Sequence, residues 1–242
     1  MAREKVILVV GAGDATGGAI ARRFAREGYL ACIVRRNAEK LGPLARRIEE
    51  EGGKVLALGC DAREEEQVAK LVERIEREVG ELEVAVFNVG GNVRFPIREM
   101  TARVYRKTWE MACFAGFLTG REAARVMVPR GRGSIFFTGA TASMRGGNGF
   151  AAFAGAKHGL RALSQSMARE LGPEGIHVAH VVIDGAIDTA WLRENFPERA
   201  ALKDRDGILD PDAIAENYWH LHRQPRSAWT HELDLRPWIE KW

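Results

Sequence analysis

Short apolar runs alternate with amphipathic segments along most of this chain, and this alternation constrains its fold more than any other feature. The first run, Val6 to Val10, contains no polar residue and ends at a glycine-rich turn. A strand that is apolar on both faces is typical of a parallel sheet with helices covering both sides. The segment 64–79 instead carries apolar residues at helical spacing with charged residues opposite, which predicts an amphipathic helix.

Strands and helices are expected to alternate to the end of the sequence. Apolar runs predict further strands at 30–34, 55–58, 84–87, 135–138 and 177–183, with a weak last strand at 233–235. Helices are expected at 19–27, 40–51, 64–79, 102–127, 151–171 and 212–221. This order predicts an α/β fold: a Rossmann-type, doubly wound, mostly parallel seven-stranded sheet with helices on both faces. No linker or repeat divides the sequence, so we expect a single domain over 1–242.

Composition and cysteine spacing argue against several classes of protein. The net charge is only +3, and basic residues are mixed with acidic ones, which argues against nucleic-acid binding. Cys32, Cys60 and Cys113 are far apart and lack metal-binding spacing, so no metal site is expected. No N-terminal apolar stretch is long enough for a secretory signal or a membrane span. We therefore expect a soluble, cytoplasmic protein with no membrane partner.

The turn after the first strand reads GAGDATGG over residues 11–18. Glycines at such a turn let the backbone approach a pyrophosphate, which then lies at the positive end of the following helix. The pattern G-x-G-x-x-G fails because Thr16 occupies its last position. The pattern G-x-x-x-G-x-G fits better, with Gly11 and Gly17 at its ends and Ala15 in place of the middle glycine; a plain tight turn is the alternative. The residues expected to bind phosphate are Gly11, Gly13, Asp14, Ala15, Thr16 and Gly17.

Further motifs follow in order, and with them the chain resembles the short-chain dehydrogenase/reductase superfamily over nearly its whole length. The segment Asn88-Val89-Gly90 is similar to the family's N-A-G segment. The segment 184–189 resembles its P-G-x-x-x-T stretch, with Asp184 in place of the proline. The resemblance implies that Asp61 contacts adenine, that the backbone near Ile187 meets the nicotinamide amide, and that Thr189 reaches a phosphate. Other cofactor-binding residues implied by these motifs are Ala62, Asn88, Val89, Gly90, Gly185 and Lys157.

The end of the second strand bears on the choice of dinucleotide. NAD enzymes usually present an acidic residue there, which binds the ribose hydroxyls. This chain has Arg35 and Arg36 instead. Two guanidinium groups suit a 2′-phosphate, so NADP (NADPH) is preferred over NAD. The alternative is that both arginines simply end the strand in water.

The resemblance also indicates which side chains would perform the chemistry, and most of them are replaced. The family's Y-x-x-x-K frame here runs from Phe153 to Lys157, so the lysine is retained and the tyrosine is absent. The serine position, counted thirteen residues back, falls on Ala140, and the asparagine position on Cys113. Phenylalanine cannot donate the proton that carbonyl reduction requires. Lys157 is expected to hold the ribose of the cofactor, with a solvated helix lysine as the alternative.

Substitute proton donors can be named from the sequence. Thr138, Thr141 and Ser143 lie in the loop where the serine would be, although hydroxyls in such loops more often form turns. The candidates are Lys157 itself, Ser143 and a bound water. The histidines at 158, 177 and 180 show no partner in the sequence and are expected to pack or lie at the surface.

The segment 184–211 has weak periodicity and, by resemblance, forms a lid over the substrate. Trp191, Leu192 and Phe196 in it would line an apolar pocket, or else pack on the body of the protein. Tryptophans are enriched in the C-terminal part, and the resemblance implies a homodimer or homotetramer paired through this region; the alternative is that the tail closes its own core. These tryptophans are Trp219, Trp229, Trp238 and Trp242.

Two functions remain open from the sequence. The first is an NADP-dependent oxidoreductase of the short-chain type with a non-standard active site, acting on a small, apolar molecule. The second is a non-catalytic NADP-binding sensor or a partner subunit of an active relative. The retained Lys157 and nucleotide loop favour the first, and the three replaced positions favour the second.

Overall fold

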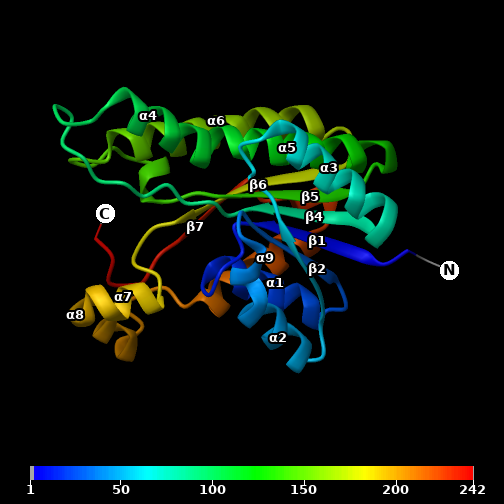
Figure 1. The fold of residues 1–242 in the computed structure, drawn as a ribbon, viewed down its shortest axis with the longest axis horizontal. Helices are drawn as coiled ribbons and strands as arrows, with labels where there is room; N and C mark the ends of the chain where they lie inside the picture. The colour runs from blue at the N-terminus through cyan, green and yellow to red at the C-terminus, as the bar shows by residue number, and fades with distance from the viewer. Residues whose placement is uncertain (1–2, 242) are drawn as a thin grey trace.

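The computed structural model describes residues 3–241 and contains one parallel sheet in the order β3-β2-β1-β4-β5-β6-β7 (Figure 1). Its strands are β1 (Lys5–Val10), β2 (Leu30–Arg35), β3 (Lys54–Gly59), β4 (Glu81–Phe87), β5 (Gly133–Thr138), β6 (Ile176–Ile183) and β7 (Glu232–Leu235). Every neighbouring pair of strands is parallel. The predicted doubly wound α/β fold is confirmed.

Helices cover both faces of this sheet. In Figure 1, α3, α4, α5 and α6 lie above it, while α1, α2 and α9 lie below. The helices are α1 (Thr16–Arg26), α2 (Gly42–Glu50), α3 (Glu65–Arg74), α4 (Ala102–Trp109), α5 (Ala115–Met127), α6 (Ala151–Leu171), α7 (Ala190–Asn195), α8 (Pro197–Ala200) and α9 (Pro211–Arg223). No helix within residues 3–241 is long and apolar enough to cross a membrane.

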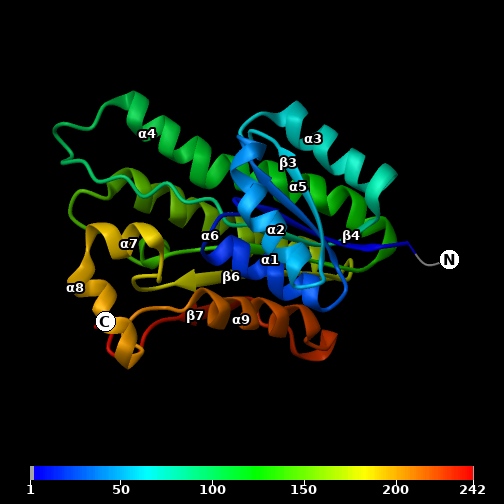
Figure 2. The same ribbon diagram turned by 60° about the horizontal axis from the view of Figure 1, so that its bottom comes forward.

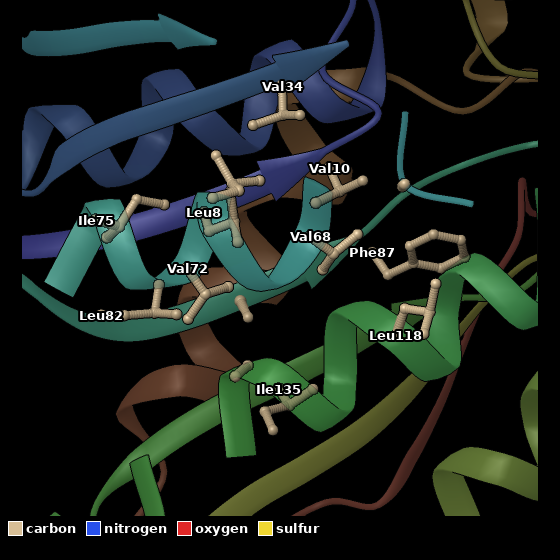
Figure 3. Packing of buried hydrophobic residues seen from close by; sticks show 14 of the residues in the cluster. Leu8, Val10, Val34, Val68, Val72, Ile75, Leu82, Phe87, Leu118 and Ile135 are labelled. Atoms are coloured by element: carbon tan, nitrogen blue, oxygen red, sulfur yellow. The ribbon is translucent and has the colours of Figure 1, made fainter. Parts of the chain in front are cut away.

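The core has two layers, one on each face of the sheet. Val6, Leu8 and Val10 of β1 belong to the layer beneath α3 and α5, which Figure 3 shows at close range. Ile7 and Val9 point the other way, into the layer packed against α1 and α9. Successive strand side chains alternate between faces, and both faces of β1 are covered by helices. This explains why its sequence is apolar without interruption.

The element boundaries differ from the expected ones where polar or small residues begin an element. The strand expected at 84–87 begins at Glu81, because Glu81 pairs with Lys5 at the polar end of the sheet. The helix expected at 19–27 begins at Thr16, because Gly17 and Gly18 form its closely packed first turn. The helix expected at 102–127 is present as α4 and α5, joined by a π-helical turn at Glu110–Phe114.

The segment 184–210 was expected to be a loop with short helical pieces, and it carries α7 and α8. Both helices lie beyond the carboxyl ends of the strands, at the left of Figures 1 and 2. Ligands of open α/β sheets bind at this edge, where neighbouring connections leave in opposite directions. Here that point lies between β1 and β4.

Candidate functional site

The turn between β1 and α1 is held against the end of β4 by glycines and one amide. Gly11 has φ +89°, and a Cβ there would stand 2.6 Å from the carbonyl oxygen of Asn88. A Cβ at Gly17 would stand 2.5 Å from the carbonyl oxygen of Gly11. The Asn88 side chain donates a hydrogen bond of 3.1 Å to that same Gly11 oxygen. The sequence motifs at 11–17 and 88–90 therefore meet in one place.

The first turn of α1 is buried beside this place and has no side-chain cap. Ala15, the residue before the helix, provides no side-chain cap. The hydroxyl of Thr16 is buried and has no hydrogen-bond partner among the described residues. At Gly13 an added Cβ would meet nothing within 4 Å. Free amides and an unpaired hydroxyl at a helix N-terminus fit an anionic group such as the pyrophosphate of a dinucleotide.

The ends of β2 and β3 carry four charged groups. Arg35 and Arg36 are exposed, which is compatible both with a ligand met from solvent and with a strand that simply ends in water. Asp61 forms an ion pair with Arg63. The Nε and Nη2 atoms of Arg63 lie 2.9 and 2.5 Å from the two carboxylate oxygens of Asp61. This pairing, with a smaller contribution from Arg36, lowers the pKa of Asp61. The sequence analysis missed Arg63, although its position two residues after Asp61 permits the pairing. Ala62, between them, is buried.

Lys157 is buried at the carboxyl end of β5, with 3% of its surface exposed. Its Nζ donates to the carbonyl oxygen of Thr138 at 2.8 Å and to that of Val89 at 3.1 Å. Burial lowers the pKa of Lys157 to about 8. The side chain therefore links α6 to the ends of β4 and β5, and it is not a solvated helix lysine.

The other three positions of the expected catalytic set lie around Lys157. Phe153, one turn earlier on α6, packs in an apolar cluster with Ala142 and Ala154, and Ala140 lies against this cluster. Cys113 is buried on the turn between α4 and α5, facing Gly159 of α6, and burial raises its pKa. The side chains at positions 140 and 153 are therefore apolar, while the Tyr105 hydroxyl lies against α6 at Gly155, where an added Cβ would stand 2.8 Å from it.

The three hydroxyls of the neighbouring loop have different surroundings. Thr138 is buried, and its hydroxyl lies 2.7 Å from that of Tyr218. Ser143 is fully buried, and its Oγ accepts a hydrogen bond of 3.1 Å from the backbone N–H of Ala140. Thr141 is partly exposed and donates a hydrogen bond to the carboxylate of Asp184. Of the three, Thr141 is the one bonded to a carboxylate, and Thr138 is bonded to a phenol.

Asp184 follows β6 directly and is 1% exposed. Its second carboxylate oxygen lies 3.4 Å from Arg145 and 3.5 Å from Arg236. From the sequence, Asp184 was predicted only to replace the proline of the family's P-G-x-x-x-T stretch. Its partners come from the loop after β5 and from the segment after β7, which are distant in sequence.

The rest of this segment leads from the sheet into α7. An added Cβ at Gly185 would stand 2.7 Å from the Pro237 ring. Ile187 forms an isolated bridge with Leu209. The Thr189 hydroxyl caps α7 by accepting from the backbone N–H of Leu192 at 3.0 Å. These contacts hold the positions expected to meet nicotinamide and phosphate at the carboxyl edge of the sheet.

The histidines of β6 have partners that the sequence did not reveal. His180 is fully buried, and its Nδ1 lies 3.0 Å from the carboxylate of Glu232 on β7. Arg161 of α6 donates to both oxygens of the same carboxylate at 2.6 Å. His177, facing the other way, stacks on Trp229 with ring centres 4.9 Å apart. His158 is exposed on α6.

The aromatic residues of the lid and tail divide into packed and exposed groups. Trp219 packs edge-on against Phe24, and Trp229 stacks on His177, so both contribute to the protein's own core. Trp191 and Phe196 are exposed, with ring centres 5.4 Å apart. Trp238 is exposed as well, while Trp242 lies outside the described residues.

Comparison with known proteins shows the family of the chain. A family model described as short chain dehydrogenase matches residues 5–200. The chain belongs to this family. It is 32% identical to the 3-oxoacyl-[acyl-carrier-protein] reductase of Bos taurus over 196 residues, which are 79% of each protein. A crystal structure of a short-chain dehydrogenase from Rhodopseudomonas palustris matches with a TM-score of 0.83 and 50% identity, covering 97% of this chain and 99% of that one.

The fold also matches that of actinorhodin polyketide ketoreductase solved with NADPH. The TM-score is 0.88 and the identity 23%, with 98% of each chain covered. At this identity the likeness concerns the fold alone. Together the matches identify the chain as a short-chain type oxidoreductase with a Rossmann-like sheet.

Proposed function

We propose that this protein is an NADP-dependent oxidoreductase of the short-chain type that transfers hydride without a tyrosine acid. The observation that carries the proposal is the uncapped first turn of α1, with the unpartnered Thr16 hydroxyl beside the Gly11–Gly17 turn. A buried hydroxyl without a partner is unfavourable, and a bound phosphate would provide the missing acceptor. Gly13, Asp14, Asn88 and Gly90 would border the bound pyrophosphate.

The preference for NADP over NAD rests on charge at the end of β2. Arg35 and Arg36 are exposed there, and Asp61 is already neutralised by Arg63. A ribose with free hydroxyls would find the Asp61 carboxylate already paired with a guanidinium. A 2′-phosphate would find guanidinium donors, which match its oxygens in charge and geometry.

The reaction is proposed to be one that needs no proton from the enzyme. Phe153 and Ala140 offer no acidic hydrogen, whereas a conjugated or cationic hydride acceptor requires none at the moment of transfer. Lys157 would hold the cofactor ribose with its remaining N–H. The exposed rings of Trp191 and Phe196 favour a small, apolar substrate beneath a lid formed by 184–211. Residues 1–242 would then act as one NAD(P)-binding domain.

A second function is favoured by the packing around Phe153. Its ring lies in an apolar cluster with Ala142 and Ala154, where a polar substrate group would lose its hydrogen bonds. The protein would then bind NADP without turnover, as a sensor or as a partner subunit of an active relative. In either case the nucleotide site is the same.

Nucleotide titration tests the part that both functions share. Purified protein is titrated with NADPH and separately with NADH, following tryptophan quenching and energy transfer to the reduced nicotinamide. Tight NADPH binding with weaker NADH binding supports the proposal, and binding of neither nucleotide overturns both functions.

Turnover separates the two functions. Oxidation of NADPH is followed with a set of conjugated enones and iminium ions as hydride acceptors. The oxidoreductase predicts consumption that is lost in Lys157→Met. Binding of NADPH without any consumption across this set favours the sensor or partner subunit.

A further inference from the structure

Asp184 and Arg145 form a charge pair at the edge of the sheet where the reaction would occur. Asp184 is almost fully buried at the end of β6, whereas 45% of the Arg145 side chain is exposed. Arg236, the second cation beside Asp184, also pairs with Asp234. Asp184, which directly follows β6, thus contacts both the loop after β5 and the segment after β7.

A dinucleotide bound in the proposed manner would extend across the sheet. Its pyrophosphate would lie over α1, between the two halves of the fold. The adenosine half belongs on the side of β2 and β3, where Arg35, Arg36 and Arg63 lie. The nicotinamide half would therefore lie over the ends of β4, β5 and β6, beside Lys157 of α6 and Asp184.

We infer that Asp184 and Arg145 set which redox form of the nucleotide this site prefers, with Asp184 favouring NADP⁺ and Arg145 favouring NADPH. The inference rests on the proposed nucleotide site. The oxidised nicotinamide ring carries one positive charge, and hydride transfer removes it. The phosphates and the adenosine are the same in both forms, so α1 and Arg36 bind both alike.

Burial makes the effect of Asp184 larger than that of an ordinary surface charge. Water screens little of the field of a nearly inaccessible carboxylate, so a charge several ångströms away still senses it. Arg145 is half exposed and is screened more strongly. The two residues should therefore act in opposite directions and to different extents, which a merely structural role would not produce.

The test measures the dissociation constants of both NADP⁺ and NADPH by calorimetry for the wild type, Asp184→Asn and Arg145→Gln. Asp184→Asn is expected to raise the ratio Kd(NADP⁺)/Kd(NADPH) by about fivefold or more. Arg145→Gln is expected to lower the same ratio by about twofold to threefold. Because Arg145 lies at the surface, that variant keeps the test informative if Asp184→Asn fails to fold.

Asp61→Asn is the matched control, since it makes the same chemical change at the adenosine end. It is expected to change both affinities by one factor and leave the ratio as in the wild type. The inference is wrong if Asp184→Asn or Arg145→Gln leaves the ratio Kd(NADP⁺)/Kd(NADPH) unchanged. The proposed nucleotide site would still stand in that case. If the wild type binds neither form, the proposed function and the inference both fall.

Discussion

The ammonium group of Lys157 lies 6.0 Å from the centre of the Phe153 ring, both side chains coming from the first two turns of α6. Both are buried, and Lys157 is fixed by the carbonyl oxygens of Thr138 and Val89. The scaffold thus holds a lysine beside a ring that has no hydroxyl. On the proposed function, Lys157 keeps its positioning role, and the Phe153 ring has no hydroxyl from which a proton could be donated.

Restoring the hydroxyls should restore proton donation. The double variant Ala140→Ser with Phe153→Tyr is expected to reduce simple ketones with NADPH at ~10²–10⁴ times the wild-type rate, because general acid catalysis contributes about that much. NADPH oxidation with a panel of cyclic ketones measures the gain, and Phe153→Tyr alone serves as the control. A double variant that binds NADPH but reduces none of them would show that the substrate pocket itself differs.

Arg36→Ala should weaken NADPH binding selectively. Hydrogen bonds to charged groups contribute about 1.5–3 kcal/mol, so we expect roughly a tenfold or greater rise in the Kd of NADPH and little change for NADH. Fluorescence titration measures both values. Lys40→Ala, which removes an exposed cation a few residues further on, should leave both unchanged. Equal effects of Arg36→Ala on the two nucleotides would contradict the 2′-phosphate assignment.

Two histidines, His180 fully buried and His222 partly buried, should make the protein sensitive to acid. Desolvation lowers the pKa of His180 and of His222 to about 4, against about 6.5 in an unfolded chain. The unfolded chain therefore takes up protons first, and stability that is complete above pH 6.5 is lost as the pH falls toward 4. Each histidine contributes a slope of up to about 1.4 kcal/mol per pH unit.

Urea unfolding at pH 7.5 and pH 5.5 measures this loss. His222 lies between the hydroxyls of Tyr29 and Ser134, at 2.8 and 2.9 Å. His222→Asn is expected to lower stability at pH 7.5 but to reduce its pH dependence. An unfolding free energy that is the same at both pH values in the wild type would show that these histidines are not buried in neutral form.

Because Trp219 and Trp229 of the C-terminal part pack within the protein itself, we expect self-association through the exposed face of α4 and α5 and not through that part. Trp109 stacks on Phe114 and Phe114 on Phe117, with ring centres 5.7 and 6.0 Å apart, and both outer rings are exposed. Phe117→Asp should shift a homodimer or homotetramer toward the monomer without lowering the melting temperature by more than a few degrees. Light scattering after gel filtration measures the mass. Phe196→Asp, at the lid, is the control and should leave the mass unchanged.

The fold could be predicted because its strands are buried on both faces. Uninterrupted apolar runs such as β1, followed by glycine turns, permit few other arrangements. Boundaries were less certain where the chain begins an element with polar or small residues, as at Glu81 and Thr16. The start of β4 is set by the pairing of Glu81 with Lys5, and the start of α1 by the close packing of Gly17. Neither contact can be read from the residues that surround it in the sequence.

Within the candidate site, positions set by local motifs were predictable, and partnerships between distant segments were not. The meeting of the glycine turn with Asn88 follows from parallel strand order. The approach of Arg236 to Asp184 depends on the path of the tail after β7. The link between His180 and Glu232 likewise needs the register of a strand whose sequence signal is weak.

The sheet order also has a consequence for how the chain reaches its native state. β6, buried along its whole length, is flanked on one side by β5 but on the other only by β7, which comes after α7, α8 and α9. During synthesis or refolding, the edge of β6 away from β5 stays without a strand partner until Glu232–Leu235 has been made and has paired with it. An apolar, unpaired strand edge is a template for other chains, so this interval is when aggregation competes most strongly with folding. Mutations that loosen the short β7 should therefore lower the yield of folded protein before they alter any property of the finished molecule.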